Sequence, residues 1–342
     1  MNEYTNETPL QPPLAPEGPD TKRCFNRVGW AYCLILGVWT GLQILLARLG
    51  DKYAPQLLES SWGIWLLSLL PLYLAAVPLG YLVLRRLPAQ QPAKGKKLSA
   101  ERLFELFTMC FALMYLGNLI GTLCNYTLAA AKGLPFENPI GEVLQNSSIL
   151  ANLVCVVGIA PVMEELIFRK LLCDRVRVCG EGTAVLTSGL VFGLFHGNLG
   201  QFFYAFLAGM LFADIYLRTG RIRYSMLLHA CINFFGGILP IILLKNVDIE
   251  KISDLSTDLP RLMSYAQNHL GAMLGFGIYG LTVLALFILG IIYLVSDRKK
   301  AAVRPAKLRA EGVPFGASFG RPGMFVYLLL SVGLMVFTAI KT

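Results

Sequence analysis

The sequence alternates long apolar stretches with short polar connections along most of its length. Most of the apolar stretches approach 20 residues, the length that a helix needs to cross the hydrocarbon core of a bilayer. Because lipid offers the backbone no hydrogen-bond partner, such stretches are expected to be helical. The pattern predicts an all-α, polytopic bundle of eight or nine transmembrane helices, at residues 28–49, 63–84, 103–124, 149–172, 183–198, 202–217, 224–244, 272–295 and 324–340.

Three polar segments refine this picture. Residues 1–26 are polar and rich in proline, so we expect a disordered cytosolic tail and not a cleavable signal peptide. The turn GNLGQ at 197–201 is so short that the fifth and sixth stretches are expected to form a hairpin. The connection between the third and fourth stretches contains GLPFENP at 133–139, which indicates a re-entrant or surface helix.

Composition excludes a soluble protein. Of the 342 residues, 55% are hydrophobic and only 15% are charged, whereas a soluble domain carries about 25% charged residues. The eight cysteines lie mostly in or beside apolar stretches and form no CxxC pair. They therefore indicate neither a disulfide framework nor a cysteine zinc site.

The net charge of +9 is distributed between the apolar stretches and lines no long polar face, which argues against nucleic acid as a partner. If the N-terminus is placed inside, 23 of the 30 lysines and arginines fall in inner connections and 7 in outer ones. Positively charged connections stay on the cytosolic side. We therefore expect an integral, multi-pass protein with its N-terminus in the cytosol. The membrane is expected to be the plasma membrane of a bacterium.

Ionisable residues inside membrane spans are costly, so each is a candidate for function. The fourth stretch ends in PVMEELIFRK, where Glu165 and Arg169 stand four residues apart, the favoured order for a helix ion pair. Arg169 would then neutralise Glu165 and leave Glu164 as an unpaired carboxylate, a competent general base if it is buried. The alternative is that both glutamates are solvated at the cytosolic interface.

Two of the three histidines lie in the same block. His196 follows Phe192 by four residues, and His229 and Asn233 share one helix face. A lone histidine in a membrane helix is more often a helix–helix hydrogen-bonding partner than a catalyst, but two beside an unpaired glutamate favour a site. We interpret the third, His269, as a loop residue without such a role.

Two further polar features have structural interpretations. Asp214 and Arg218, four residues apart, are expected to form an ion pair at the inner end of the sixth stretch. Gly197 and Asn198 are expected to serve the hairpin turn.

The order EExxxR, FxxxH and HxxxN on successive apolar helices resembles the three motifs of the CPBP family, the CAAX proteases and bacteriocin-processing enzymes. The resemblance covers residues 146–245, which would be a catalytic core between N-terminal transmembrane helices at 27–145 and C-terminal ones at 246–342. It implies an intramembrane endopeptidase, a peptide hydrolase that acts on a membrane-associated protein or peptide. Its substrate class would be of the CAAX or bacteriocin type.

The resemblance also implies a role for each motif residue. Glu164 with His196 would activate a water for attack on a peptide carbonyl. His229 and Asn233 would donate hydrogen bonds to the oxyanion of the tetrahedral intermediate. Glu165 and Arg169 would hold the helix in place and tune the base, and Phe192 would pack below His196 and keep the water ordered. These three supporting residues complete the expected site.

A metal ion is the open question of this mechanism. The family is usually labelled metalloprotease, and Glu164, His196 and His229 could supply three zinc ligands with an open fourth position. In that case the base must be another group, for which Glu165 is the obvious candidate. No HExxH motif is present to decide the matter. We favour the metal-free, glutamate-dependent mechanism.

Two other classes of protein remain as alternatives. A non-proteolytic immunity or scaffold protein could keep the fold and bind a peptide, although it would have no need to retain Glu164. A secondary transporter could use the same polar residues as an ion site. The chain shows no internal repeat, which is a common feature of such carriers.

The charge distribution generates a topology prediction. The connections at 85–102 and 298–321 are expected to be cytosolic. A single cysteine introduced at position 90 or 310 of a cysteine-free variant should therefore be protected from an impermeant thiol reagent in intact cells. Labelling of either position without permeabilisation would contradict the N-in topology.

Overall fold

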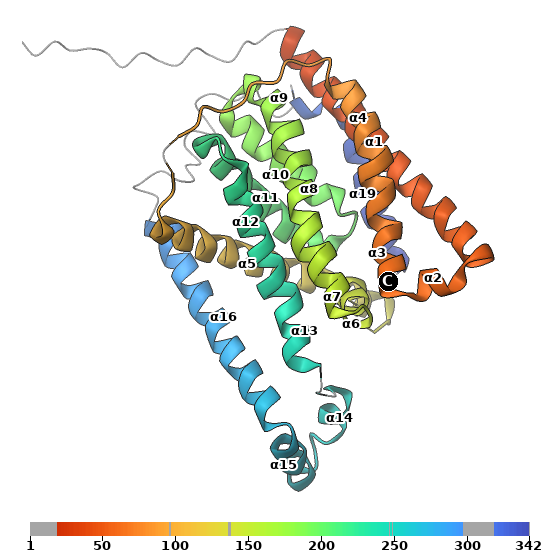
Figure 1. Ribbon diagram of the computed structural model, residues 1–342, viewed down its shortest axis with the longest axis vertical. Helices are drawn as coiled ribbons and strands as arrows, with labels where there is room; N and C mark the ends of the chain where they lie inside the picture. The colour runs from red at the N-terminus through yellow and green to blue at the C-terminus, as the bar shows by residue number, and fades with distance from the viewer. Residues whose placement is uncertain are drawn as a thin grey trace, which may run out of the picture.

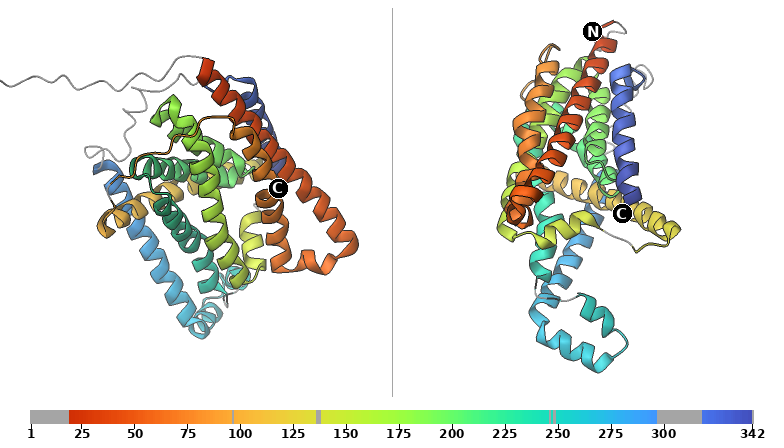
Figure 2. Two further views of the ribbon diagram at one scale, coloured as in Figure 1. Left: turned by 45° about the horizontal axis from the view of Figure 1, so that its top comes forward. Right: turned by 90° about the vertical axis from the view of Figure 1, so that its right-hand side faces the viewer.

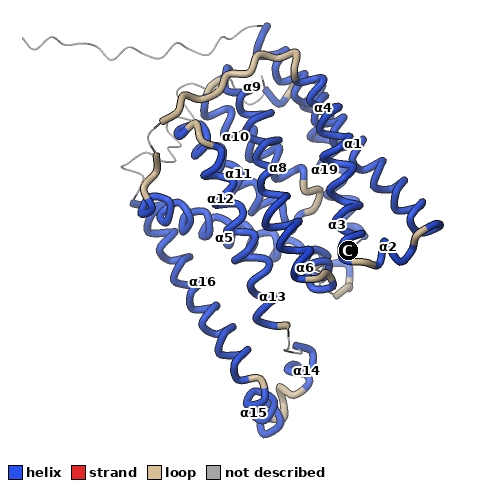
Figure 3. Tube along the Cα trace, in the orientation of Figure 1, coloured by secondary structure: helices blue, strands red, loops and turns tan. Residues whose placement is uncertain are grey.

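The computed structural model describes residues 19–95, 97–135, 138–245, 247, 249–296 and 318–341. Every regular element within these ranges is a helix (Figures 1 and 3). The all-α bundle predicted from the apolar pattern is therefore confirmed. Within the described residues, eight helices are long and apolar enough to cross a membrane: Thr21–Tyr53, Ser61–Leu84, Ala100–Lys132, Ile149–Cys179, Leu199–Thr219, Ile222–Leu244, Leu270–Ser296 and Pro322–Ile340.

The remaining predicted span, the fifth, is a shorter helix. It is α10 (Glu181–Phe195), which has 15 residues. It packs along α11 (Leu199–Thr219), and the turn between them contains Gly197 in the left-handed region, at φ 64°. The expected hairpin is thus present. Asn198 closes it, because its Oδ1 accepts from the Gln201 amide at 2.8 Å and its Nδ2 donates to the His196 carbonyl at 3.0 Å.

The expectation of disorder up to residue 26 is wrong for its last part. Helix α1 (Pro19–Tyr53) begins at a proline, whose missing N–H costs nothing in the first helical turn. Cys24 and Phe25 already pack into the core, with 3% and 0% of their surface exposed. Their burial extends the helix beyond the apolar stretch that the sequence marks. Residues 1–18 lie outside the described residues.

The expected helix between the third and fourth spans is α6 (Pro139–Asn146). Asn138 caps it, since its Oδ1 accepts from the Gly141 amide at 3.2 Å. α6 lies between the long helix α5 (Ala100–Lys132) and the start of span four.

The two ends of the described chain lie side by side. α19 (Pro322–Lys341) runs along α1 (Figure 2), and the Gly323 amide donates to Asn26 Oδ1 at 2.8 Å. Away from this pair, the short helices α14 (Ile249–Asp254) and α15 (Leu259–Asn268) cover the ends of α13 (Leu239–Leu244) and α16 (Leu270–Ser296). The residues of the motifs therefore belong to the middle of the bundle.

Span four is an alternation of α-helical and π-helical turns. It runs through α7 (Ile149–Asn152), η2 (Leu153–Ile159), α8 (Ala160–Glu165), η3 (Leu166–Cys173) and α9 (Asp174–Val176). Single π-helical turns are rare and frequently mark functional sites. Glu164 and Glu165 are the last two residues of α8, the short α-helical segment between two π-helical segments.

Span two lies beside span four and runs in the same direction. It comprises α3 (Ser61–Leu70), η1 (Pro71–Ala76) and α4 (Val77–Leu84). At one end Trp65 Nε1 donates to Asn152 Oδ1 at 3.0 Å, and at the other Arg175 Nε donates to the Leu84 carbonyl at 2.8 Å. These bonds join residues 87 and 91 positions apart, so the two spans keep nearly constant register.

Candidate active site

The motif residues meet around one fully buried ion pair. Glu165 Oε2 lies 3.0 Å from Arg169 Nε, and neither side chain exposes any surface. The predicted pair within span four is therefore confirmed. Arg169 Nη1 also donates to Ser188 Oγ on α10 at 3.0 Å, and Ser188 donates in turn to the Phe168 carbonyl at 3.1 Å.

Aromatic rings enclose the guanidinium of Arg169. Its central carbon lies 5.1 Å from the ring centre of Phe192 on α10 and 5.5 Å from that of Phe212 on α11. A cation over an aromatic face gains most when water is excluded, on the order of 2 kcal/mol. The cation is thus held by a carboxylate, a hydroxyl and two π faces from three helices.

His229, on α12 (Ile222–Asn233), stands between the two glutamates. Its Nδ1 lies 3.2 Å from Glu165 Oε1, and its Nε2 lies 3.7 Å from Glu164 Oε2. A carboxylate ionised by its arginine only accepts hydrogen bonds, so Nδ1 is the donor to Glu165. The ring stacks on Phe212 at 5.1 Å and meets the edge of Phe192 at 5.8 Å. The i, i+4 rule could not reveal this link, because it joins residues 64 positions apart.

Glu164 has a different environment from its neighbour. Its side chain is 23% exposed, and the cation beside it in sequence is taken by Glu165. The spacing of the charged residues predicted this difference between the two glutamates. It did not predict that Glu164 lies beside His229.

His196 ends α10 at the same level. Its Nδ1 shares a hydrogen bond with the Phe192 carbonyl at 2.9 Å, and its ring meets Phe192 edge-on at 4.9 Å. The imidazole is close enough to Glu164 and His229 to interact electrostatically with both. Phe192 therefore touches Arg169 and both histidines, and it sets their mutual positions.

Asn233 donates a hydrogen bond to the backbone of span four, at a carbonyl that the helix itself leaves without a donor. In η2 the Ala160 amide donates to the Cys155 carbonyl, five residues back. The next bond in that series would join residue 161 to the Val156 carbonyl, but Pro161 has no N–H. Asn233 Nδ2 supplies the missing donor at 2.8 Å. Asn233 thus holds α12 against the break in span four.

The other polar residues singled out in the sequence lie apart from this cluster. Asp214 and Arg218 form the expected pair, with Oδ1 and Nε 2.7 Å apart. His269 stacks on Tyr265 at 4.2 Å, next to α15. Neither pair contacts the glutamates.

A metal ion at the cluster would need at least three ligands at suitable distances from one another. Within the ranges that the structure describes, no three histidine, cysteine, aspartate or glutamate side chains are arranged to hold one. His229 directs Nδ1 to Glu165 and His196 directs Nδ1 to a backbone carbonyl, an orientation that leaves Nε2 of each ring for another partner. The spacing of Glu164, His196 and His229, and not the orientation of the rings, therefore fails to fit a three-ligand zinc site, and the mechanism proposed for this chain uses no metal.

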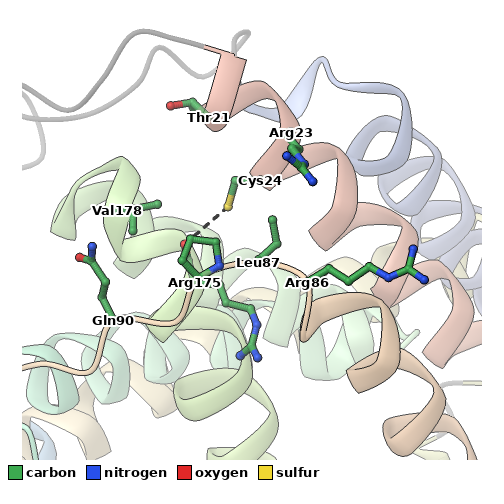
Figure 4. A pocket seen from close by; sticks show the side chains of 9 residues that line it. Thr21, Arg23, Cys24, Arg86, Leu87, Gln90, Arg175 and Val178 are labelled. Carbon is green, nitrogen blue, oxygen red and sulfur yellow. Dashed lines mark hydrogen bonds between the residues drawn. The ribbon is translucent and has the colours of Figure 1, made fainter.

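A cavity of about 320 Å³ lies elsewhere, beside the start of α1 (Figure 4). Arg175 lines it but directs its guanidinium to backbone carbonyls, Nε to Leu84 and Nη1 to Leu171 at 2.9 Å. Cys24 donates to the Arg175 carbonyl at 3.5 Å. No motif residue lines this cavity, so the candidate site is the glutamate–histidine cluster.

Comparison with known proteins gives the cluster its context. Residues 146–235 match the model of the family described as "Type II CAAX prenyl endopeptidase Rce1-like". This match spans all three motifs and supports the resemblance to the CPBP family that the sequence indicates. At family level it supports a membrane protease.

A curated bacterial protein supports the same assignment. The chain is 26% identical over 180 residues to "Putative membrane peptidase YdiL" of Bacillus subtilis (strain 168). The alignment covers 51% of this chain and 71% of that protein. No solved structure matches the chain.

The two glutamates are expected to respond differently to substitution. Glu165→Gln and Arg169→Ala each leave a buried charge without its partner, which typically costs about 3–5 kcal/mol. Glu164→Gln removes a partly exposed carboxylate and should unfold close to the wild-type temperature. Thermal unfolding in detergent measures the difference. Equal destabilisation by Glu164→Gln and Glu165→Gln would contradict the assignment.

Proposed function

We propose that the chain is an intramembrane endopeptidase that hydrolyses a peptide bond of a membrane-associated protein or peptide. The observation that carries this proposal is the asymmetry of the two glutamates. Arg169 neutralises Glu165, while Glu164 keeps an exposed edge beside His229 and His196. One carboxylate is structural and its neighbour is available for proton transfer.

In the proposed reaction Glu164, with His196, takes a proton from a water as its oxygen attacks the peptide carbonyl carbon. A tetrahedral intermediate forms with a negative charge on the former carbonyl oxygen. Glu164 then returns the proton to the nitrogen of the leaving amine as the C–N bond breaks. All atoms and charges balance without a further reactant.

We assign the stabilisation of the oxyanion to His229 and Asn233. One N–H of the Asn233 amide is used by Val156, which leaves the second for the intermediate. His229 donates through Nε2 when its ring carries both protons, because Nδ1–H is given to Glu165. The same contacts hold both residues rigidly, and preorganised donors cost nothing to reorient during the reaction.

The substrate class is proposed from the comparisons. The matched family is described by its action on CAAX prenyl sites, and the bacterial relative is described as a membrane peptidase. We propose a substrate anchored in or on the bilayer, of the CAAX or bacteriocin-precursor type. The protein would act as a multi-pass protein of a bacterial plasma membrane, with its N-terminus in the cytosol.

Peptide cleavage tests the function directly. The purified protein in lipid vesicles should hydrolyse members of a library of internally quenched peptides, with and without a farnesylated C-terminal cysteine. Glu164→Gln should lose this activity, and Glu142→Gln, on the exposed face of α6, should keep it. Absence of cleavage by the wild type, or full activity of Glu164→Gln, would refute the proposal and favour a binding or transport protein.

Kinetics and metal analysis test the roles of His229 and Asn233. Loss of an oxyanion donor acts on the transition state, so His229→Ala and Asn233→Ala should each lower kcat about 10²–10³-fold with little change in KM. Asn152→Ala is the matched control for Asn233→Ala. It removes an amide that donates to the Leu144 carbonyl at 2.7 Å, so it should lower stability and spare kcat. One stoichiometric zinc in active wild type that His229→Ala loses would overturn the metal-free mechanism.

A further inference from the structure

Span two carries a buried hydroxyl that has no partner. Tyr73 lies in the π-helical turn η1, and its phenolic oxygen is closed to solvent without any hydrogen bond. A buried polar group left unpaired costs about 1–3 kcal/mol relative to a satisfied one. Nearby tyrosines avoid this cost. Tyr32 donates to the Ile167 carbonyl at 2.9 Å and Tyr327 to the Val191 carbonyl at 3.0 Å.

The register of spans two and four places Tyr73 opposite the segment of span four that ends at Glu164. The bonds that join the two spans connect residues 87 positions apart at one end and 91 at the other. Applied to Tyr73, these offsets give residues 160 and 164. Tyr73 therefore faces α8, whose last two residues are the motif glutamates.

Electrostatic contacts agree with this register. The ionisable groups near enough to act on the Tyr73 hydroxyl are Glu164, at the end of the segment that the register indicates, and Cys155. Span two thus places a hydroxyl in the neighbourhood of Glu164, and α12 places His229 beside the same carboxylate.

Three other polar side chains, those of His229, Asn233 and Tyr204, each already make at least one hydrogen bond within the protein. His229 Nδ1–H goes to Glu165, and one Asn233 N–H goes to Val156. Tyr204 also interacts with Glu164, but its oxygen accepts from Gln201 Nε2 at 2.7 Å, so its hydroxyl is already part of a network. Tyr73 is the tyrosine of this group with an orphaned hydroxyl in the described structure.

We propose that Tyr73 is a further catalytic residue, whose hydroxyl donates a hydrogen bond to the oxyanion of the peptide bond attacked at Glu164. The inference rests on the proposed endopeptidase function. A peptide carbonyl beside Glu164 supplies the acceptor that the hydroxyl lacks, and the bond strengthens as negative charge develops on the oxygen. The unfavourable burial in the free protein is offset most fully when the oxyanion has formed.

Tyr73→Phe tests this role because it removes one oxygen and keeps the ring. The assay uses the library peptide that the wild type hydrolyses fastest. We expect kcat to fall on the order of 10²-fold with KM unchanged. The unfolding temperature should be equal to or above that of the wild type, because an unpaired hydroxyl disappears. Loss of activity without loss of stability separates catalysis from packing.

Two tyrosines serve as controls. Tyr279 donates to the Phe235 carbonyl at 2.8 Å, so Tyr279→Phe should lose stability and keep its kcat. Tyr204→Phe should affect kcat less than Tyr73→Phe does. A kcat of Tyr73→Phe within about threefold of wild type, a change in KM alone, or a lowered unfolding temperature would overturn the inference. Such outcomes leave the endopeptidase function intact if wild type cleaves and Glu164→Gln does not.

Discussion

The buried pair of Glu165 and Arg169 is the constraint on which the site depends. Arg169 reaches α10 through Ser188 and is enclosed by rings from α10 and α11, while Glu165 reaches α12 through His229. One ion pair in span four therefore fixes three further helices. Because an uncompensated charge in this position is so unfavourable, arrangements of these helices that separate the pair are strongly destabilised. The arrangement that keeps the pair leaves Glu164 at the partly exposed edge of the cluster.

Apolar periodicity and charge spacing were sufficient to predict the helical bundle, the hairpin of α10 and α11, and the pairs Glu165–Arg169 and Asp214–Arg218. These features depend on residues close in sequence. The bridge from His229 to both glutamates depends on how distant helices rotate and pack, which no local pattern encodes. The start of α1 was misplaced for the same reason, since Cys24 and Phe25 owe their burial to helices elsewhere in the chain.

The irregular geometry of span four explains why the motif residue Asn233 has a structural role beside the proposed catalytic one. Pro161 interrupts the π-helical bonding of η2, and the Asn233 amide repairs it. In the proposed mechanism the same amide also faces the substrate. The structural role was indicated by the sequence, because a proline three residues before the first glutamate removes a backbone N–H and leaves a carbonyl without its helical donor. Which side chain would fill the place could be learned only from the packing of α12.

The position of the buried pair within a single helix also matters for how the protein enters the membrane. A charged residue at the centre of a span costs about 2.5–3.5 kcal/mol during insertion by the translocon. Glu165 and Arg169 are one turn apart, so they can neutralise each other as soon as span four forms, before α10 and α12 have been synthesised. A charge whose counterion lay on a later helix would remain unpaired in lipid until that helix was inserted. The chain can thus be inserted span by span, and the cluster of glutamates and histidines is completed only when α12, which carries His229, has been inserted.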